Sequence, residues 1–506
     1  HFQQGGYSMT FSTHLRRISA IGVAGVLTIG LVSCIERNTG TGKTGDIGKI
    51  VETKTTGEKS GMTYLIAQPE KSEDKTIAAD VDELIQETEI MLAGLAERTG
   101  ASMKELPPVT ITYLGKGNTL TRDPVQPVAE PDEKFNDETD GDRRAARKAF
   151  VTSFTAIKPQ TRNSFELGLP TRLRALTLRD AEVRKQTIAL TGELGGRVSE
   201  KVEPNKPGKL VPQGWSLNDD NRLRLRGVNQ RVTTWPWRTI VQFNYGGNNS
   251  GCSGSLVGPR HVVTAAHCII AAGTDDYFAF TVSSGRGGNQ WTAQSNMPGC
   301  PNSATQDCPS VGATYWYFVP SQWRASNTSN REQYDFGVIV IPNRLGNTVG
   351  WMGYWYAPIN SLNTVNKYSR GYPSCAAPNR IDDPADPLAC ATCTTDLTVC
   401  NPQHLYGDGA RCSIGNATNV DSSGYNRNFR MSCDGSAGMS GSPMYFYGNG
   451  NVGNSGSVYY TAHDIQSTCG GTANSSSCAN VTRADRLVRN TPEYSGWISY
   501  FRSTFP

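Results

Sequence analysis

The chain has 506 residues, which is enough for two or three domains and at least one large apolar core. It holds 49 Lys and Arg against 45 Asp and Glu, and this near balance argues against a basic nucleic-acid-binding surface or an acidic tail. No nucleic-acid partner is therefore expected.

Glu and Lys are unevenly distributed along the chain. Residues 36–213 contain 18 Glu and 15 Lys, whereas residues 214–506 contain Glu332, Glu493 and Lys367 alone and are rich in Gly, Ser, Asn, Tyr and Trp. This contrast predicts two differently built regions.

Residues 9–34 have the pattern of an export signal. Two arginines precede the apolar run 18–32, which is too short to span a bilayer comfortably. The stretch LVSC, ending at Cys34, is also similar to a bacterial lipobox, in which the cysteine would be lipidated and would anchor the precursor to a membrane. An ordinary signal peptide that contains Cys34 is the alternative. Both interpretations predict export, and after it a secreted, extracellular protein.

Residues 35–220 are polar and contain no catalytic constellation. The apolar spacing predicts an amphipathic helix over Lys75–Arg98 that stops at Gly100. A second, basic helical stretch is predicted over Thr171–Leu194, and the segment Val202–Gly214, with three prolines, is predicted to be a linker.

The thirteen cysteines agree with export. Apart from Cys34, all lie between Cys252 and Cys478, and such an even set in one half of the chain is typical of a disulfide-bonded extracellular domain. A zinc site would depend on Cys390 and Cys393, but no second CxxC motif or paired histidines lie near them. No metal and no other cofactor is therefore expected.

From Trp235 onward the pattern changes to short β runs separated by Gly, Asn and Pro. These runs are rich in β-branched and aromatic residues and predict an all-β barrel or sandwich. One helix is predicted to close the chain, starting at Thr491 with Pro492 in its first turn and burying Trp497, Ile498 and Phe501. The β runs are residues 239–245, 253–258, 261–268, 336–341, 443–448 and 457–464.

Three residues of this β-rich region carry the groups that a serine hydrolase needs. A serine hydroxyl is a poor nucleophile near neutral pH, so an imidazole must take its proton and a carboxylate must hold the imidazole tautomer. His267 lies in VTAAHC at the end of a predicted strand, Asp335 precedes the apolar strand in YDFGVIV, and Ser440 lies in GMSGSP. Each motif alone is common, but the order His, Asp, Ser in an exported β-rich domain predicts a serine protease.

The glycines around Ser440 allow a tight turn. Such a turn can aim backbone N–H groups at the oxyanion that develops during acyl transfer. The N–H groups of Gly438 and Ser440 are the predicted oxyanion hole.

With these motifs, the region from about Asn221 to Arg502 resembles the chymotrypsin-like serine proteases, and more closely the bacterial glutamyl endopeptidases. The resemblance implies that residues 221–506 are a trypsin-like protease domain: a double antiparallel β-barrel, six strands in each barrel, with the triad between them and a C-terminal helix. It also implies a disulfide between Cys252 and Cys268 that braces His267. Further stretches similar to the subfamily are Val232–Val241, Tyr317–Trp323, Gly346–Gly350 and Gly371–Pro373.

Met439 precedes the predicted nucleophile. In the trypsin-type branch an aspartate stands there and receives the new N-terminal amine on activation, and Met439 cannot form that ion pair. Glutamyl endopeptidases also lack the aspartate. The resemblance therefore argues against a trypsin-style zymogen switch.

Substrate preference depends on three residues. In the resembled subfamily a histidine on the strand after the nucleophile loop binds the substrate carboxylate, and His463 in YYTAHD matches it. The subfamily often has a threonine five residues before the nucleophile; here Gly435 stands there, with Ser436 beside it as a substitute. Asp434 falls where trypsin-like enzymes place the acid that selects Arg or Lys. We expect Glu, then Asp, at P1, with an Arg/Lys-specific pocket as the alternative.

The expected function is an exported, monomeric serine endopeptidase that cleaves protein or peptide substrates through an acyl-enzyme. Residues 35–220 would be a partly helical pro-region that assists folding or blocks the cleft, removed within Leu210–Gly227. The alternative class is a surface-anchored binding protein that retains a protease fold without turnover.

Overall fold

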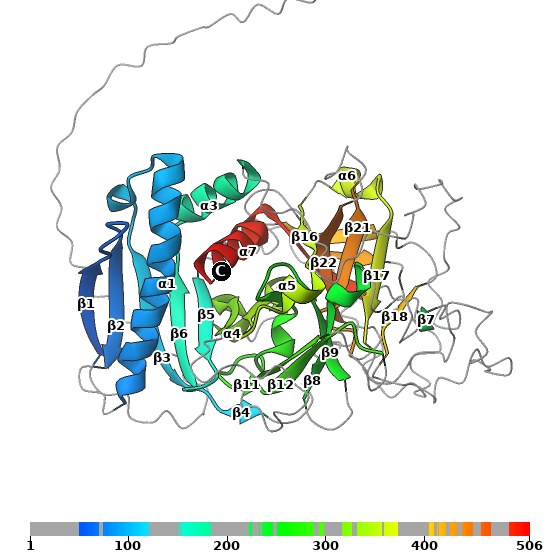
Figure 1. Cartoon of the computed structure of the whole chain (residues 1–506), viewed down its shortest axis with the longest axis horizontal. Coiled ribbons are helices and arrows are strands. Elements are labelled where there is room, and N and C mark those ends of the chain that lie inside the picture. The colour runs from blue at the N-terminus through cyan, green and yellow to red at the C-terminus, as the bar shows by residue number, and fades with distance from the viewer. Residues whose placement is uncertain are drawn as a thin grey trace, which may run out of the picture. The chain divides into compact units, whose positions relative to one another are not determined.

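The computed structural model describes the larger part of the chain, from residue 50 to residue 505 (Figure 1). The export signal 9–34, the linker Val202–Gly214, Asp434 and Ser436 lie outside the described residues. No described helix is both long and apolar enough to cross a membrane. The described residues are 50–69, 74–120, 151, 153–183, 222–224, 232, 235–245, 250–287, 293–297, 316–325, 331–356, 359–372, 404–408, 412, 414–420, 426–431, 433, 438–448, 457–466 and 485–505.

The first sheet of the β-rich region is antiparallel throughout, in the order β14-β15-β10-β9-β8-β12-β13. Its interior is filled by apolar residues of these strands, and all four residues of β10 and of β15 are buried. The strands are β8 (Ile240–Asn244), β9 (Ser250–Leu256), β10 (His261–Thr264), β12 (Phe280–Ser284), β13 (Ala293–Met297), β14 (Trp316–Pro320) and β15 (Gly337–Val340).

The second sheet runs in the order β19-β20-β23-β22-β21-β17-β18-β7, and a short strand, β16 (Gly353–Tyr354), pairs with β22 in parallel. A disulfide between Cys412 and Cys433 braces this sheet; the sequence had left the partners of both cysteines open. The strands are β7 (Arg222–Arg224), β17 (Lys367–Gly371), β18 (Tyr406–Asp408), β19 (Ile414–Val420), β20 (Asn426–Met431), β21 (Pro443–Tyr447), β22 (Val458–Gln466) and β23 (Asp485–Arg489).

The chain closes with the predicted helix, α7 (Pro492–Thr504). The hydroxyl of Thr491 accepts a hydrogen bond from the Tyr494 N–H and caps the helix, and Pro492 occupies the first turn, where its missing N–H costs nothing. Trp497, Ile498 and Phe501 are fully buried. Each such side chain stabilises the fold by about 1.5–3 kcal/mol. The predicted β-rich fold with a C-terminal helix is confirmed, and each of the six predicted β runs overlaps a strand.

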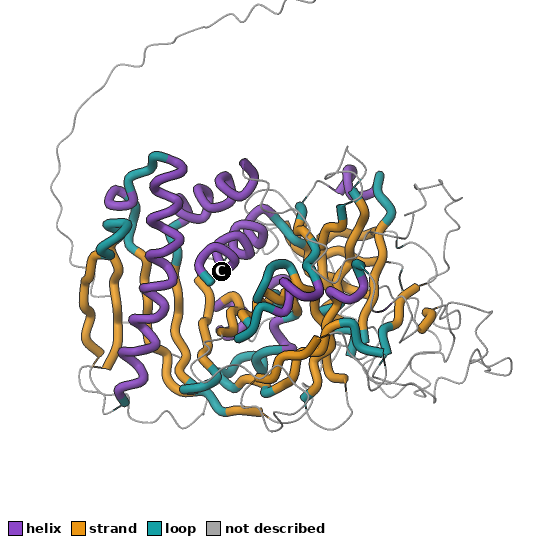
Figure 2. Tube along the Cα trace, in the orientation of Figure 1, coloured by secondary structure: helices purple, strands orange, loops and turns teal. Residues whose placement is uncertain are grey.

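The region before the β-rich part holds the two helices that the sequence predicted. Helix α1 (Lys75–Thr99) ends at Gly100, whose φ of 66° is left-handed and whose N–H caps the carbonyl of Ala96. Helix α3 (Thr171–Val183) begins where predicted; the rest of that prediction lies outside the described residues. Figure 2 shows the longer helices gathered around the N-terminal strands and the C-terminus.

This region also contains five strands that the sequence analysis missed, in the order β1-β2-β3-β6-β5. Strands β2 and β3 are parallel and the other neighbours antiparallel, and α1 lies over the sheet (Figure 1). We call residues 50–69, 74–120, 151 and 153–183 the N-terminal module. The five strands of its sheet are β1 (Ile50–Thr56), β2 (Thr63–Pro69), β3 (Val109–Lys116), β5 (Ser153–Lys158) and β6 (Asn163–Gly168).

The two regions share one sheet. Strand β5 pairs antiparallel with β14, so the five strands of the module and the seven of the first sheet form a single 12-stranded sheet. Strand β14 therefore has a hydrogen-bonded neighbour on each side, β15 and β5. The remaining short elements are β4 (Thr119–Leu120), β11 (Tyr277–Phe278), α4 (Ser321–Ala325), α5 (Leu345–Val349), α6 (Ile359–Asn363) and 3₁₀ turns at Met103–Glu105, Trp237–Thr239, Ala266–Cys268 and Arg331–Tyr334.

Candidate active site

His267 and Asp335 are brought together by the pairing of β10 with β15. Thr264, at the end of β10, lies opposite Gly337, at the start of β15, so the residues just beyond these two strand ends meet. Asp335 Oδ2 lies 2.7 Å from His267 Nδ1, and Asp335 Oδ1 accepts the backbone N–H of His267 at 2.8 Å. Both side chains are at least 97% buried. Both carboxylate oxygens of Asp335 therefore bind His267, and they fix the position and the plane of its imidazole.

This geometry fixes which imidazole nitrogen can act as a base. A carboxylate accepts hydrogen bonds, so Nδ1 of His267 carries the proton that faces Asp335. The other nitrogen, Nε2, is then the basic one, and it is buried without a hydrogen-bond partner among the described residues. His267 is thus poised to take a proton from a nearby group.

A disulfide holds the turn that carries His267. Cys252 in β9 is bonded to Cys268, with 6.0 Å between the Cα atoms, as the family resemblance implied. The Tyr245 hydroxyl also donates to the Cys268 carbonyl at 2.7 Å. These two restraints tie the 3₁₀ turn to β9 and limit movement of the imidazole.

Ser440 lies on a loop that is pressed against the first sheet. Two of its glycines, Gly438 and Gly441, have φ values of 89° and 81°, which other residues rarely adopt. A Cβ on Gly441 would come within 2.1 Å of the Ser253 carbonyl and of the Thr264 hydroxyl. The Ser253 N–H and hydroxyl donate to the carbonyls of Ser440 and Gly438, at 2.7 and 3.0 Å. Glycine is therefore required at Gly441 for the loop to approach so closely.

The loop residues include the two predicted oxyanion donors, Gly438 and Ser440. Ser440 is 1% exposed and Met439 is fully buried. A methionine suits that apolar position, whereas the aspartate of a trypsin-type enzyme would need a charged partner there. Sequence reasoning did not single out Ser253 or Thr264, because their contacts join strands that are remote in the chain.

His463 lies on β22, directly opposite Pro443 of the adjacent strand β21, and is fully buried. Its Nε2 lies 2.8 Å from the backbone carbonyl of Asp335, and its Nδ1 lies 2.6 Å from the hydroxyl of Tyr460. A carbonyl only accepts, so Nε2 is the donor and Nδ1 accepts from Tyr460. Burial lowers the pKa of His463 to about 4, which keeps the ring neutral at neutral pH.

The structure therefore places His463 beside Asp335, with both ring nitrogens engaged within the protein. A substrate carboxylate could receive the Nε2–H only after this proton left the Asp335 carbonyl. Asp434 and Ser436, the two other predicted specificity residues, lie outside the described residues. Tyr460, the partner of His463, had no signal in the sequence.

One group of side chains among the described residues could hold a metal ion by its geometry. Cys252, His267 and Cys268 have ligand atoms within 4.8 Å of one another. Both sulfurs are joined in the disulfide and offer no thiolate, which is the form that binds metals. This cluster is therefore a brace for His267.

Comparisons with known proteins show which families the chain is similar to. The family model described as Trypsin matches residues 225–298. The chain is 32% identical over 185 residues to a glutamyl endopeptidase of Bacillus licheniformis, covering 36% of this chain and 50% of that protein. It is 29% identical over 231 residues to an extracellular metalloprotease of Bacillus subtilis, covering 43% of this chain and 66% of that protein. A solved Glu endopeptidase structure aligns with 56% of this chain and 97% of its own, at 18% identity and a TM-score of 0.34.

These findings confirm that the chain resembles the chymotrypsin-like serine proteases, and the glutamyl endopeptidases among them. The chain spans half to two thirds of the length of the two curated relatives. The matched trypsin segment includes Cys252, His267 and Cys268, the residues that carry and brace the imidazole.

Proposed function

We propose that the chain is a serine endopeptidase in which Ser440 is the nucleophile, His267 the general base and Asp335 the residue that orients the base. The observation that carries the proposal is the pair of hydrogen bonds that His267 donates to Asp335, at 2.7 Å from Nδ1 and 2.8 Å from the backbone N–H, which leaves Nε2 as the nitrogen that can accept a proton. The loop of Ser440, with Gly438 and Gly441 at positive φ, is the second observation that supports the proposal. The trypsin and glutamyl endopeptidase similarities support the same chemistry.

The reaction follows from these roles. Ser440 Oγ attacks the carbonyl carbon of the scissile bond while His267 Nε2 takes the hydroxyl proton. The N–H groups of Gly438 and Ser440 stabilise the oxyanion that forms. The C–N bond then breaks, His267 gives its proton to the leaving amine, and an acyl-enzyme ester remains. A water molecule, deprotonated by Nε2, attacks the ester, releases the acid and restores the Ser440 hydroxyl.

A serine-directed covalent probe separates this proposal from a non-catalytic binding protein with the same fold. We expect a fluorophosphonate to label the active wild-type protein on Ser440 and to leave a Ser440→Ala variant unlabelled, because only an activated hydroxyl reacts. Mass spectrometry of the labelled peptide locates the adduct. A metal chelator should leave both labelling and peptidase activity unchanged. Activity that is lost to the chelator but survives the probe would contradict the proposal.

We further propose that the enzyme prefers Glu, and more slowly Asp, at P1. The similarity to a glutamyl endopeptidase and the position of His463 support this preference. His463 would donate its Nε2–H to the substrate carboxylate after exchanging it from the Asp335 carbonyl. A bound carboxylate would also raise the pKa of His463 above its present value of about 4.

Cleavage of a denatured protein mixture, read by mass spectrometry, tests this preference. We expect cuts after Glu, then Asp, and expect His463→Ala to lower the preference for Glu over Gln more than it lowers the overall rate. His261→Ala is the matched control, because His261 is also fully buried but bonds to the Phe501 carbonyl. Cuts clustered after Arg and Lys, and lost in Asp434→Ser, would favour the trypsin-like pocket instead.

We propose that the protein is exported and matures from a precursor, with residues 35–220 as the pro-region. The charged start and apolar run of residues 9–34 support export, with or without lipidation of Cys34. The similarity to an extracellular protease of Bacillus subtilis is consistent with it.

The precursor is expected to be nearly inactive and to gain activity when it is cut within Leu210–Gly227. Strand β7 (Arg222–Arg224) is paired with β18, which protects its backbone, so the cut should fall on either side of β7. N-terminal sequencing of the active form gives the position. Full activity of an uncut chain would show instead that residues 35–220 are an accessory domain.

A further inference from the structure

The N-terminal module is joined to the first sheet by a continuous β ladder. Phe154, Thr155, Ala156 and Ile157 of β5 lie opposite residues 317–320 of β14. All six residues of β5 and all five of β14 are buried. Strand β5 therefore forms part of the interior and covers an edge that would otherwise present unpaired backbone groups.

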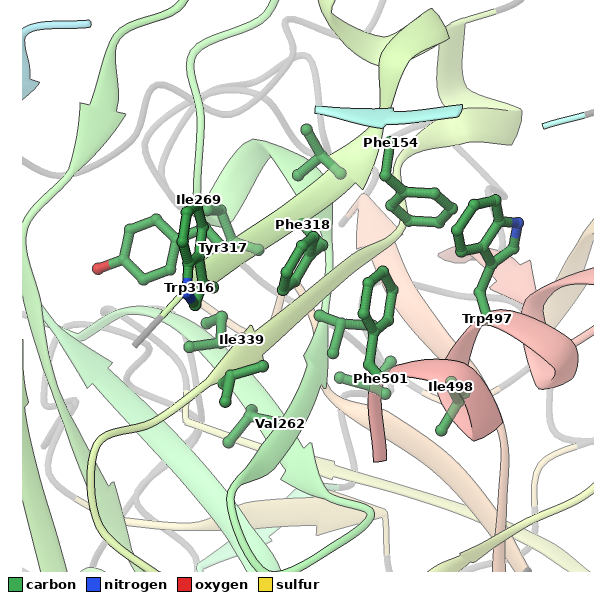
Figure 3. Packing of buried hydrophobic residues seen from close by; sticks show 14 of the residues in the cluster. Phe154, Val262, Ile269, Trp316, Tyr317, Phe318, Ile339, Trp497, Ile498 and Phe501 are labelled. Carbon is green, nitrogen blue, oxygen red and sulfur yellow. The ribbon is translucent and has the colours of Figure 1, made fainter. Parts of the chain in front are cut away.

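An aromatic cluster continues this contact. Phe154 is fully buried, with its ring centroid 4.0 Å from that of Trp497 and 5.3 Å from that of Phe501, both on α7 (Figure 3). It also lies edge-on to Phe336, at 6.3 Å. Phe336 directly follows Asp335, so a side chain of the module packs against the residue next to the proposed catalytic carboxylate.

A buried ionic cluster crosses the same interface. Glu493 is 6% exposed and accepts hydrogen bonds from the Val151 N–H at 2.6 Å and from Arg174 at 3.3 Å, both in the module. Its other oxygen accepts from Arg427 of β20 at 3.0 Å. Arg427 is fully buried and also donates to Gln333, two residues before Asp335. Glu493 is one of only two glutamates after residue 213.

Polar contacts lie along the rest of the interface. The Thr88 and Tyr500 hydroxyls are 2.8 Å apart and buried. The Trp316 indole N–H donates to Glu83 at 2.8 Å, and Lys158, bound to the same Glu83, lies over the Trp316 ring at 5.3 Å. Thr88, Glu83 and Lys158 belong to the module, so their contacts with Tyr500 and Trp316 cross the interface.

From these contacts we propose that the N-terminal module stays bound to the two sheets after the chain is cut, as a permanent second subunit of the mature protein. Loss of the module would expose Phe154, Trp497 and Phe501 to water, and would leave the Arg427–Glu493 pair without two of its donors. It would also open the edge of β14. A pro-segment that departs on maturation would instead be expected to bury few such groups. The cut is part of the proposed function, but the binding of the module does not depend on catalysis.

The test uses the full chain with Ser440→Ala, so that it cannot cut itself. A recognition sequence for an unrelated site-specific protease is inserted between Gln213 and Gly214, and the chain is cut there. We expect both fragments to elute together at the volume of the uncut chain in size-exclusion chromatography, with a one-to-one mass in native mass spectrometry. Separation into a free module and a folded C-terminal fragment would overturn the proposal.

Two variants test whether the described interface holds the fragments together. Arg174→Met removes one partner of Glu493 while keeping much of the side-chain length, and should raise the dissociation constant of the cut fragments about 100-fold. Phe154→Asp should separate them. The matched control is Leu65→Asp, on an exposed part of β2, which should leave them together. If Phe154→Asp does not fold before the cut, Arg174→Met alone decides, and an unchanged dissociation constant counts against the interface.

A parallel cut of the chain with Ser440 intact keeps the two proposals apart. Fragments that stay together but hydrolyse no ester or peptide would refute the protease function and leave the subunit proposal standing. A C-terminal fragment that is active after the module has been removed would refute the subunit proposal and leave the function standing.

Discussion

Replacing Ser440 by Ala is expected to lower kcat by about a million-fold and to leave KM nearly unchanged, because the nucleophile is lost while the substrate contacts remain. His267→Ala should cost about as much. The two residues act as a unit, so the double variant should be no slower than either single variant. The measurement is hydrolysis of a peptide substrate by the activated protein.

The fold is the control for this result. Ser440→Ala should unfold at the same temperature as the wild type, since the side chain loses one oxygen on a loop held by backbone contacts to Ser253. A purified Ser440→Ala protein that kept substantial peptidase activity would refute the assignment. A double variant much slower than both single variants would show that Ser440 and His267 act independently.

The second large effect is expected from Asp335→Asn, with kcat reduced about 10,000-fold. The backbone N–H of His267 donates to one side-chain oxygen of Asp335 at 2.8 Å. The asparagine carbonyl must keep that hydrogen bond, so its amide nitrogen faces Nδ1 and donates to it. The imidazole proton then moves to Nε2, and the nitrogen that should accept the serine proton is blocked.

Solvent-exposed Asp82 on α1 provides the matched control, and Asp82→Asn should leave kcat unchanged. Circular dichroism, recorded across the pH range of the activity assay, separates a tautomer effect from misfolding. The Asp335→Asn protein should have the wild-type spectrum at every pH at which its activity is low. A loss of less than tenfold would show that Asp335 does not orient the base.

The proposed catalytic residues could be singled out in the sequence because their motifs are local. His267 follows one short apolar strand and Asp335 precedes another, and Ser440 lies between glycines whose backbone angles the structure requires. The contacts of His463 could not be predicted in the same way. Its Nε2 is bound to the backbone carbonyl of Asp335, which lies 128 residues away in the chain, and no side-chain pattern marks a backbone carbonyl.

The strands of the N-terminal module were missed for a physical reason. Strand β1 is mostly exposed and carries Glu52 and Lys54, so it has no apolar alternation. Strand β5 is fully buried, yet it contains Ser153 and Lys158, whose polar atoms are bound by Glu166 and Glu83. Buried polar residues with partners look like loop residues in a sequence. The scarcity of glutamate after residue 213 was visible, but only the structure shows Glu493 binding the module.

The interface with α7 also determines when, during synthesis of the chain, the N-terminal module can complete its packing. Thr88 and Tyr500, which share a hydrogen bond, are separated by 412 positions, and Val151 and Glu493 by 342. Synthesis runs from the N-terminus, so the module is made long before α7 and its apolar face stays uncovered until that helix follows. Until α7 (Pro492–Thr504) appears, neither Phe154 nor the strand next to Asp335 has its full packing. The packing around the proposed catalytic carboxylate is therefore complete only after α7 has been made.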